Sequence, residues 1–358
     1  MRDSYLPSYR GKKSRGHKHY TFGILFLLIL LIAGGWWVYS LLFAPNIDVT
    51  RDKEASIEIA TGSNFDAVKK SLYSKGYIIH RMNFELLAKY KKYEASIKPG
   101  RYILKSSMGN LELINKLRSG NQDPVQVVFN SVRFPENLAA RISDQIEADS
   151  VSLIRLMKDS AFLDSMGGTP ISLFTMMIPN TYEFYWNTDA RSFLKRMKTE
   201  SDKFWNSKRE KQLKILNLNR HQVITLASIV EKETNQNDEK ARIAGVYLNR
   251  LKKGWLLEAD PTLVFAQGNF EIRRVLNIYK QIDSPYNTYK YTGLPPGPIC
   301  LPSVSSIDAV LYPETHNYMF FCAREDFSGY HNFAATIAQH NLNAWKYQQA
   351  LNKKDILK

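Results

Sequence analysis

The sequence predicts an α+β protein in three parts: one N-terminal transmembrane helix, a small α+β module and a larger α+β domain. Three observations support this prediction. Residues 21–44 form an uncharged apolar run, strand and helix patterns alternate in residues 45–123, and residues 124–358 hold a longer series of amphipathic helical patterns. The boundary near Asp123 rests on the change of pattern that begins with VQVVF at Val125.

The apolar run predicts a membrane anchor. It reads TFGILFLLILLIAGGWWVYSLLFA, long enough for a helix to cross a bilayer core of about 30 Å. A cleaved signal peptide, the alternative, has a shorter apolar region and a small-x-small cleavage site, which this run fits poorly. Residues 1–20 are basic, with Asp3 as the only acidic side chain, so the positive-inside rule places them in the cytoplasm. We therefore expect a single-pass protein of the cytoplasmic (inner) membrane, with everything after Ala44 outside.

Composition narrows the possible partners. Lys and Arg exceed Asp and Glu by 49 to 34, a net charge of +15, which favours polyanionic surroundings. For a chain outside the membrane, wall polymer or lipid is a better partner than nucleic acid. Cys300 and Cys322 lack a metal-binding or redox spacing and are expected to be small buried residues, with a single disulfide as the alternative.

The exported part begins with a compact strand, helix, helix, strand, helix pattern. A short strand is expected at residues 56–60, then a helix with a cap-like Thr61 or Ser63 that ends at Gly76. A second helix covers residues 81–93, a strand follows the Pro99-Gly100 turn, and a third helix closes at Gly120.

The larger domain is predicted to be mainly helical. After a strand at VQVVF, helical periodicity marks RFPENLAARISDQI, SLIRLMKDSAFLDSM and residues 190–205. Residues 221–234, HQVITLASIVEKET, form a further helix. The next, in NQNDEKARIAGVYLNRLKKGW, should be capped near Asn237 or Asp238 and end before Gly254.

Two glutamates near the end of the HQVITLASIVEKET helix are candidate catalytic groups. At 100° per residue, Glu231 and Glu233 lie on opposite margins of its apolar face, while Lys232 points away from it. Burial at such a margin would raise the pKa of a carboxyl group and favour a general acid. Periodicity does not choose between the two, and most glutamates are simply solvated.

Groups suited to a polar substrate follow within about a hundred residues. Aromatic rings can meet the apolar face of a sugar, and amides can bond its hydroxyl and acetamido groups. Two of these residues could instead have a purely structural role: Asp260 could cap a helix, and Arg250 could cover a helix C-terminus. No HExxH, cysteine cluster, GxSxG, Walker loop or convincing GxGxxG occurs, so we expect neither metal nor cofactor. The candidate substrate-binding residues are Asn249, Arg250, Asp260, Tyr286, Asn287, Tyr289, His331 and His340.

Four stretches resemble a known family. LASIVEKET, VYLNRLKKGWLLEADPT, DSPYNTYKYTGLPPGPI and HNFAATIAQHN, in this order, resemble the YceG-like endolytic murein transglycosylases, also called the MltG family. PNTYEFYW and the single anchor agree with it. Residues 45–123 resemble, more weakly, that family's LysM-like module, and residues 124–358 its catalytic domain.

The resemblance implies cleavage of the β-1,4 bond between N-acetylmuramic acid and N-acetylglucosamine in nascent glycan strands, leaving 1,6-anhydromuramyl ends and limiting strand length. It implies action beside wall synthases, the penicillin-binding proteins, and a single glutamate that serves as acid and then base. The family's essential glutamate aligns with Glu233, with Glu231 in reserve. A non-catalytic peptidoglycan-binding scaffold for a synthase and a water-using muramidase are the alternatives.

Overall fold

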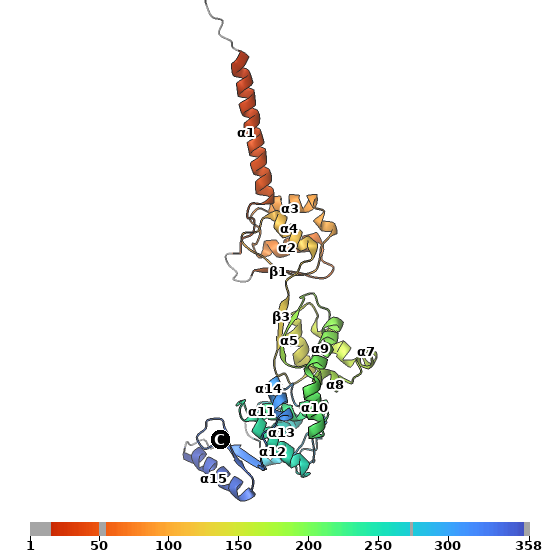
Figure 1. Ribbon diagram of the computed structural model, residues 1–358, viewed down its shortest axis with the longest axis vertical. Coiled ribbons are helices and arrows are strands. Elements are labelled where there is room, and N and C mark those ends of the chain that lie inside the picture. The colour runs from red at the N-terminus through yellow and green to blue at the C-terminus, as the bar shows by residue number, and fades with distance from the viewer. Residues whose placement is uncertain (1–15, 50–54, 273–274, 354–358) are drawn as a thin grey trace, which may run out of the picture. The chain divides into compact units, whose positions relative to one another are not determined.

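The structure is a computed structural model that describes residues 16–49, 55–272 and 275–353 (Figure 1). It divides into two compact units, Met1–Asp123 and Pro124–Lys358. Both combine helices with short antiparallel strand pairs, so the predicted α+β class is confirmed.

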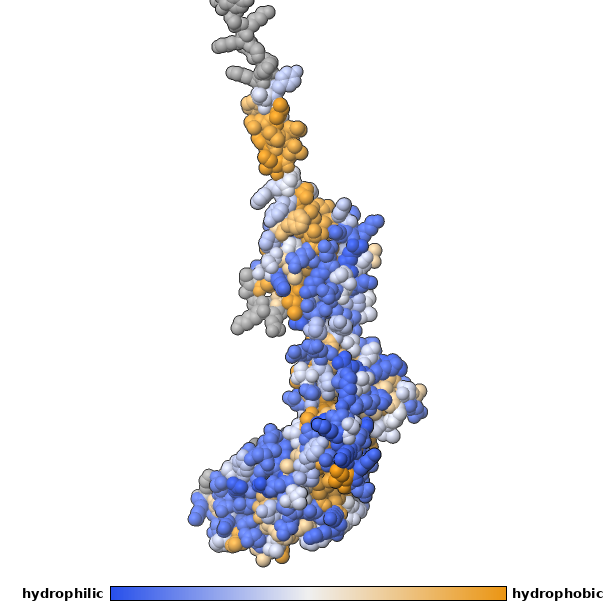
Figure 2. All heavy atoms as spheres, in the orientation of Figure 1, coloured by the Kyte–Doolittle hydropathy of each residue, from blue (hydrophilic) through white to orange (hydrophobic). Residues whose placement is uncertain are grey.

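The first unit begins with helix α1, Gly16–Leu42. Within it, Tyr20–Leu42 reaches a mean hydropathy of 2.2 and is not buried against the rest of the chain. In the part of the chain that the structure describes, this is the one helix long and apolar enough to cross a membrane. Figure 2 shows a hydrophobic band along most of this helix.

The rest of the first unit follows the predicted order of elements. Strands β1 (Ser56–Ile59) and β2 (Gly100–Ile103) pair antiparallel. The helices are α2 (Phe65–Ser74), α3 (Arg81–Tyr90) and α4 (Asn110–Ser119), with a 3₁₀ turn, η1, at Tyr93–Ala95. The predicted cap of α2 was wrong: its N-terminus is capped by Asn64, whose side chain accepts a hydrogen bond from the Ala67 amide. Gly120 ends α4 at a φ of 74°.

The second unit opens with β3 (Val125–Phe129), which pairs with β4 (Asn180–Phe184); four helices lie between the two strands in sequence. The helices between and after them are α5 (Pro135–Ser143), α6 (Ser150–Lys158), α7 (Ser160–Ser165), α8 (Pro170–Thr175) and α9 (Ala190–Phe204). No strand was predicted at β4. Asp159 divides the predicted helical stretch into α6 and α7, because its side chain accepts the Phe162 amide and begins a new helix.

In the rest of the unit, helix α11 (Arg220–Glu233) is buried through its middle and packs against α12 (Lys240–Lys252) and α14. The predicted cap of α12 was wrong: the helix starts at Lys240, after Glu239, and neither Asn237 nor Asp238 caps it. The other elements are α10 (Ser207–Leu216), α13 (Asp260–Gln267), the 3₁₀ turn η2 (Asn277–Gln281), α14 (Val304–Leu311), the paired strands β5 (Phe320–Ala323) and β6 (His331–Ala334), and α15 (Ile337–Lys353).

Candidate active site

Helix α11 places the two glutamates. A reciprocal capping box between Asn219 and Gln222 starts the helix, and every side chain from residue 223 to residue 230 is buried. The sequence predicted one apolar face; the helix is instead enclosed on all sides through its middle. The first and last turns of the helix reach the surface, and in the last turn Glu231 and Glu233 leave the core in different directions and meet different surroundings.

Glu233 lies in the wall of a cavity of about 760 Å³, within the second unit. This volume falls in the range of about 300–1,000 Å³ typical of ligand pockets. Phe265 and Phe270 supply aromatic rings, and Arg133 and Lys232 supply positive charges. The remaining lining residues are Asp260, Pro261, Val264, Ile272, Val275, Ile299, Tyr347, Gln348 and Leu351.

The surroundings of Glu233 favour its protonated form. Burial raises its pKa from 4.5 to about 7, against the opposing effect of a hydrogen bond that the Tyr247 hydroxyl donates to Oε1. The charge of Asp260 raises the pKa further, and that of Arg250 lowers it. Near neutral pH, Glu233 can therefore hold a proton or release it, as a general acid and base requires.

Tyr247 holds the glutamate in place. It is 1% exposed, comes from the middle of α12, and its ring meets Phe321 of β5 edge-on at 5.8 Å. Burial beside the glutamate raises the pKa of this phenol well above its usual value, so the hydroxyl stays a donor. Sequence analysis missed this residue, because its spacing on α12 reads as an ordinary core position.

Asp260 and Tyr289 form a second polar pair close to Glu233. The Tyr289 hydroxyl donates to Asp260 Oδ1 at 2.6 Å, and burial raises the pKa of Tyr289. The pair depends on Thr288, whose Oγ1 accepts the Ala259 amide at 3.0 Å and lies 2.8 Å from Thr262 Oγ1. Asp260 is the first residue of α13, not its cap.

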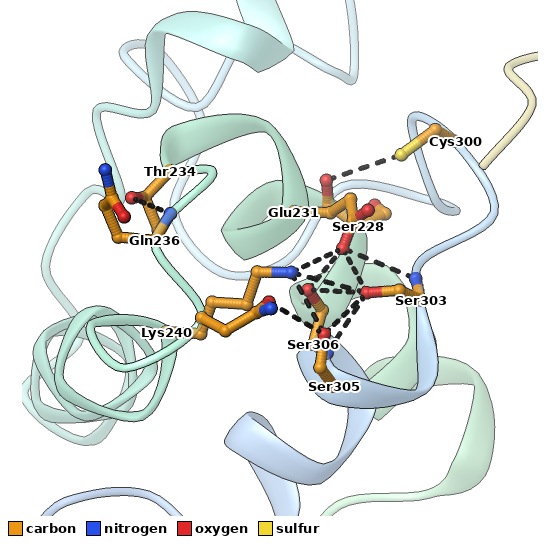
Figure 3. A network of polar contacts seen from close by, with 10 residues as sticks. Ser228, Glu231, Thr234, Gln236, Lys240, Cys300, Ser303, Ser305 and Ser306 are labelled. Atoms are coloured by element: carbon orange, nitrogen blue, oxygen red, sulfur yellow. Dashed lines mark hydrogen bonds and ion pairs between the residues drawn. The ribbon is translucent and has the colours of Figure 1, made fainter. Parts of the chain in front are cut away.

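Glu231 faces away from this cavity, into a cluster of serines and a lysine (Figure 3). Its Oε2 accepts hydrogen bonds from Ser303 Oγ at 2.6 Å and from Ser306 Oγ, and lies 3.2 Å from Lys240 Nζ. Burial acts to raise the pKa of Glu231, but these donors and the lysine charge together hold it below 4.5. Glu231 is thus a carboxylate that ties α11 to α12 and α14.

Several other predicted site residues hold loops of the second unit together. The Asn249 amide donates to the His316 and Tyr318 carbonyl oxygens at 2.9 and 3.0 Å. The buried Asn287 amide donates to the Lys280 and Ile282 carbonyl oxygens. None of these side chains lines the cavity that contains Glu233.

Arg250 and the two histidines are also engaged outside the cavity lining. Arg250 is 7% exposed and donates hydrogen bonds to the Met319 and Leu257 carbonyl oxygens. It therefore does not cover the C-terminus of α12, the structural role that the sequence also allowed. His331 Nδ1 lies 2.9 Å from the buried Glu239 carboxylate. His340 stacks on Phe320 at 5.3 Å, and burial lowers its pKa.

Tyr286 supports the cavity indirectly, since its ring lies 4.7 Å from that of Phe265, which lines it. Of the eight predicted substrate-binding residues, the structure therefore brings Asp260 into the cavity with Glu233, and Tyr289 next to Asp260. The cavity residues that sequence analysis missed come from five segments, near residues 133, 232, 265, 299 and 348. Aromatic or basic character could have indicated some of them, but the aliphatic lining residues carry no such signal in the sequence.

Both cysteines are free thiols: Cys300 is buried and Cys322 half-buried. The Cys300 thiol lies 3.7 Å from the Ser228 carbonyl oxygen, and the Ser228 hydroxyl accepts the Ile299 amide, which fastens this cavity wall to α11. Within the described residues, no group of three or more His, Cys, Asp or Glu side chains is arranged to hold a metal ion.

Comparison with known proteins identifies the chain's relatives. The model of the YceG-like family matches residues 57–346. The chain belongs to the YceG-like family. An endolytic murein transglycosylase of Bacillus subtilis is 29% identical over 340 residues, which cover 90% of this YceG-like chain and 93% of the relative.

Two further relatives agree with this assignment. An endolytic murein transglycosylase of Streptococcus pneumoniae is 29% identical over 338 residues, which cover 86% of the YceG-like chain and 61% of that longer protein. A crystal structure of a yceG-like protein from Listeria monocytogenes matches with a TM-score of 0.56 and 28% identity, over 81% of this chain and 98% of that one.

Proposed function

We propose that this protein is a peptidoglycan lytic transglycosylase, which cuts the bond between N-acetylmuramic acid and N-acetylglucosamine within nascent glycan strands. The observation that carries the proposal is Glu233, a carboxyl group with a pKa near 7 in the wall of a cavity of sugar-binding size. Two relatives that span most of the chain bear the name endolytic murein transglycosylase, which agrees with this chemistry.

The proposed reaction uses Glu233 twice. As an acid it protonates the glycosidic oxygen while the bond to the anomeric carbon of the muramyl residue breaks. As a base it then takes the proton of the muramyl 6-hydroxyl, whose oxygen bonds to the anomeric carbon. The glutamate ends protonated as it began, and the products are a 1,6-anhydromuramyl end and a free N-acetylglucosamine 4-hydroxyl.

The proposed substrate agrees with the cavity. Flat rings such as Phe265 and Phe270 suit the apolar face of a sugar, and the cations Arg133 and Lys232 suit the carboxylates of muramic acid and its stem peptide. In this proposal the other predicted binding residues do not contact the sugar but hold in place the segments around the cavity. They are Asn249, Arg250, Tyr286, Asn287, His331 and His340.

We further propose that α1 anchors the protein in the cytoplasmic membrane, with residues 1–20 in the cytoplasm and the rest outside. The length and hydropathy of α1 and the basic character of the segment before it support this orientation. In this place, the first unit would act as a LysM-like module and the second as the catalytic domain. Glycan strands and neighbouring penicillin-binding synthases would be the partners, with no role for nucleic acid.

A water-using muramidase is the second candidate, and Asp260 favours it. Glycosidases that use water commonly carry two carboxyl groups, and Asp260 lines the same cavity as Glu233. The two reactions differ in the attacking oxygen, which is that of water or that of the 6-hydroxyl. Their products differ by the mass of one water molecule.

The test is a digest of purified, uncrosslinked glycan strands by the full-length protein, with products weighed by mass spectrometry. We expect anhydromuramyl products from the native protein and none from Glu233→Gln, with Glu231→Gln as the matched variant that keeps the acid. Hydrated products would support the muramidase. An intact glycan with tight binding would instead support a non-catalytic scaffold.

A further inference from the structure

Helix α3 carries an exposed apolar stripe that the proposed reaction does not use. Ile79, Met82, Leu86 and Tyr90 are 52, 82, 46 and 81% exposed. Their spacing of three and four residues puts them on one face of the helix and of its lead-in, opposite the side that packs into the core of the first unit. An apolar face this exposed usually marks a contact surface.

Two buried asparagines hold the start of α3 to the end of α1. The Asn110 amide donates to the Leu41 carbonyl oxygen at 2.9 Å and accepts from Asn46 at 2.6 Å. Asn46 in turn accepts the His80 amide at 2.6 Å and donates to the His80 carbonyl oxygen at 3.2 Å. Asn46 and Asn110 are 2 and 0% exposed, and His80 directly precedes α3. This asparagine clasp links the two helices.

The backbone is equally close at this junction. A side chain at Gly109 would place its Cβ 2.7 Å from the Phe43 carbonyl oxygen, so the start of α4 lies directly against the end of α1. Pro45 forms a β-bridge with Gly109, and Ile47 forms one with Ile78. No free linker therefore separates α1 from the rest of the first unit. The depth of α1 in a membrane would fix the distance of α3 from the membrane surface.

The length of α1 brings that junction to the membrane surface. Tyr20–Leu42 has 23 residues, or about 35 Å at about 1.5 Å per residue, against a bilayer core of about 30 Å. The excess is about one helical turn. Leu42 therefore lies close to the outer boundary of the hydrocarbon core, where Trp36, Trp37 and Tyr39 suit the interface.

We propose that the α3 stripe rests in the headgroup region of the same membrane, on its outer side, so that the first unit docks on lipid. This inference depends on the proposed anchoring by α1. The exposed Lys89 lies at the margin of the stripe and is placed to meet lipid phosphates, as in helices that lie in a membrane interface. Figures 1 and 2 show α3 beside the end of α1, with hydrophobic residues gathered there.

The test measures the depth of nitroxide labels on the full-length protein in lipid nanodiscs. Labels are attached at Met82→Cys and Tyr90→Cys in a Cys322→Ser background; both sites are exposed, so the fold should be unaffected. Glu58→Cys is the control, because β1 lies at the end of the first unit away from α1 (Figure 1). Relaxation by oxygen, which concentrates in lipid, is compared with relaxation by a water-soluble nickel complex.

We expect the ratio of oxygen to nickel accessibility to be severalfold higher at residues 82 and 90 than at residue 58. Equal ratios at the three sites would overturn the inference. Protection from both reagents would also overturn it, since it would mean that a second copy or another protein covers the stripe. A label at Leu30→Cys separates the premise from the inference: low oxygen accessibility there would mean that α1 is not in the bilayer.

Discussion

The free energy of unfolding should depend on pH because Glu233 is buried. The folded-state pKa is about 7 and the ordinary value 4.5, so the folded state holds this proton more tightly than the unfolded chain. Stability from this group is present below pH 4.5 and is lost as the pH rises through 7. Over the whole pH range, this group changes the free energy of unfolding by about 3.4 kcal/mol, and about 2.5 kcal/mol of that change falls between pH 5 and pH 8.

The perturbation is Glu233→Gln, which keeps the shape of the side chain and can still accept the Tyr247 hydrogen bond but does not titrate. All other ionisable groups are common to both proteins. The free energy of unfolding of the native protein, relative to the variant, should therefore fall by up to about 2.5 kcal/mol from pH 5 to pH 8. Glu233 is half-buried, so this figure is an upper limit.

The assay is urea unfolding in detergent micelles at several pH values, followed by tryptophan fluorescence. This signal reports mainly on the second unit, which contains Trp186, Trp205, Trp255 and Trp345. Glu231→Gln serves as a control, because the pKa of Glu231 is displaced in the opposite direction. A stability difference between native protein and Glu233→Gln that stays constant from pH 5 to pH 8 would refute the reasoning.

Three further predictions concern the same region. Tyr247→Phe removes a hydrogen bond that lowers the pKa of Glu233, so the alkaline limit of activity should move to higher pH in initial-rate profiles; an unmoved limit would contradict this. Glu231→Gln leaves its lysine partner buried without a counter-charge, and should cost about 3 kcal/mol of unfolding free energy at pH 7. The cost should shrink as the pH falls below 4.5, because the unfolded chain then binds a proton at this glutamate while the folded-state pKa lies lower. Arg133→Gln combined with Lys232→Gln should raise KM severalfold on peptide-bearing glycan. It should leave kcat and the pH limits of activity unchanged, since neither cation is among the charges that set the pKa of Glu233. An equal rise in KM on a carboxylate-free oligosaccharide would count against anion recognition.

Features that depend on neighbouring residues were predictable from sequence. The apolar run gave α1, and hydrophobic periodicity gave α2, α3, α4, α9 and α11 within a few residues of their observed ends. The errors arose where local signals compete. Asn64 caps α2 although Thr61 and Ser63 also offer capping oxygens, and β4 escaped prediction because its pairing partner lies some fifty residues earlier in the chain.

The choice between two nearby glutamates shows what sequence could not give. Periodicity placed Glu231 and Glu233 on opposite margins of α11, and both are indeed partly buried. Burial acts to raise the pKa of both, but at Glu231 the hydrogen bonds from Ser303 and Ser306 and the charge of Lys240 outweigh it. At Glu233 burial outweighs the single hydrogen bond from Tyr247, so the pKa is raised. The family resemblance pointed to Glu233, but no local pattern did.

By itself, the sequence determined the fold class, the apolar N-terminal helix, the family and the helix that carries the acidic pair. Each of these depends on the spacing of residues close together in the chain or on short motifs. Only the tertiary structure decided which buried carboxyl group has a raised pKa, that Tyr247 bonds it, and that most of the other polar candidates hold loops. The physical reason is that desolvation and hydrogen bonding depend on atoms within a few ångströms. Those atoms come from segments 14 to 75 residues away, which folding alone brings together.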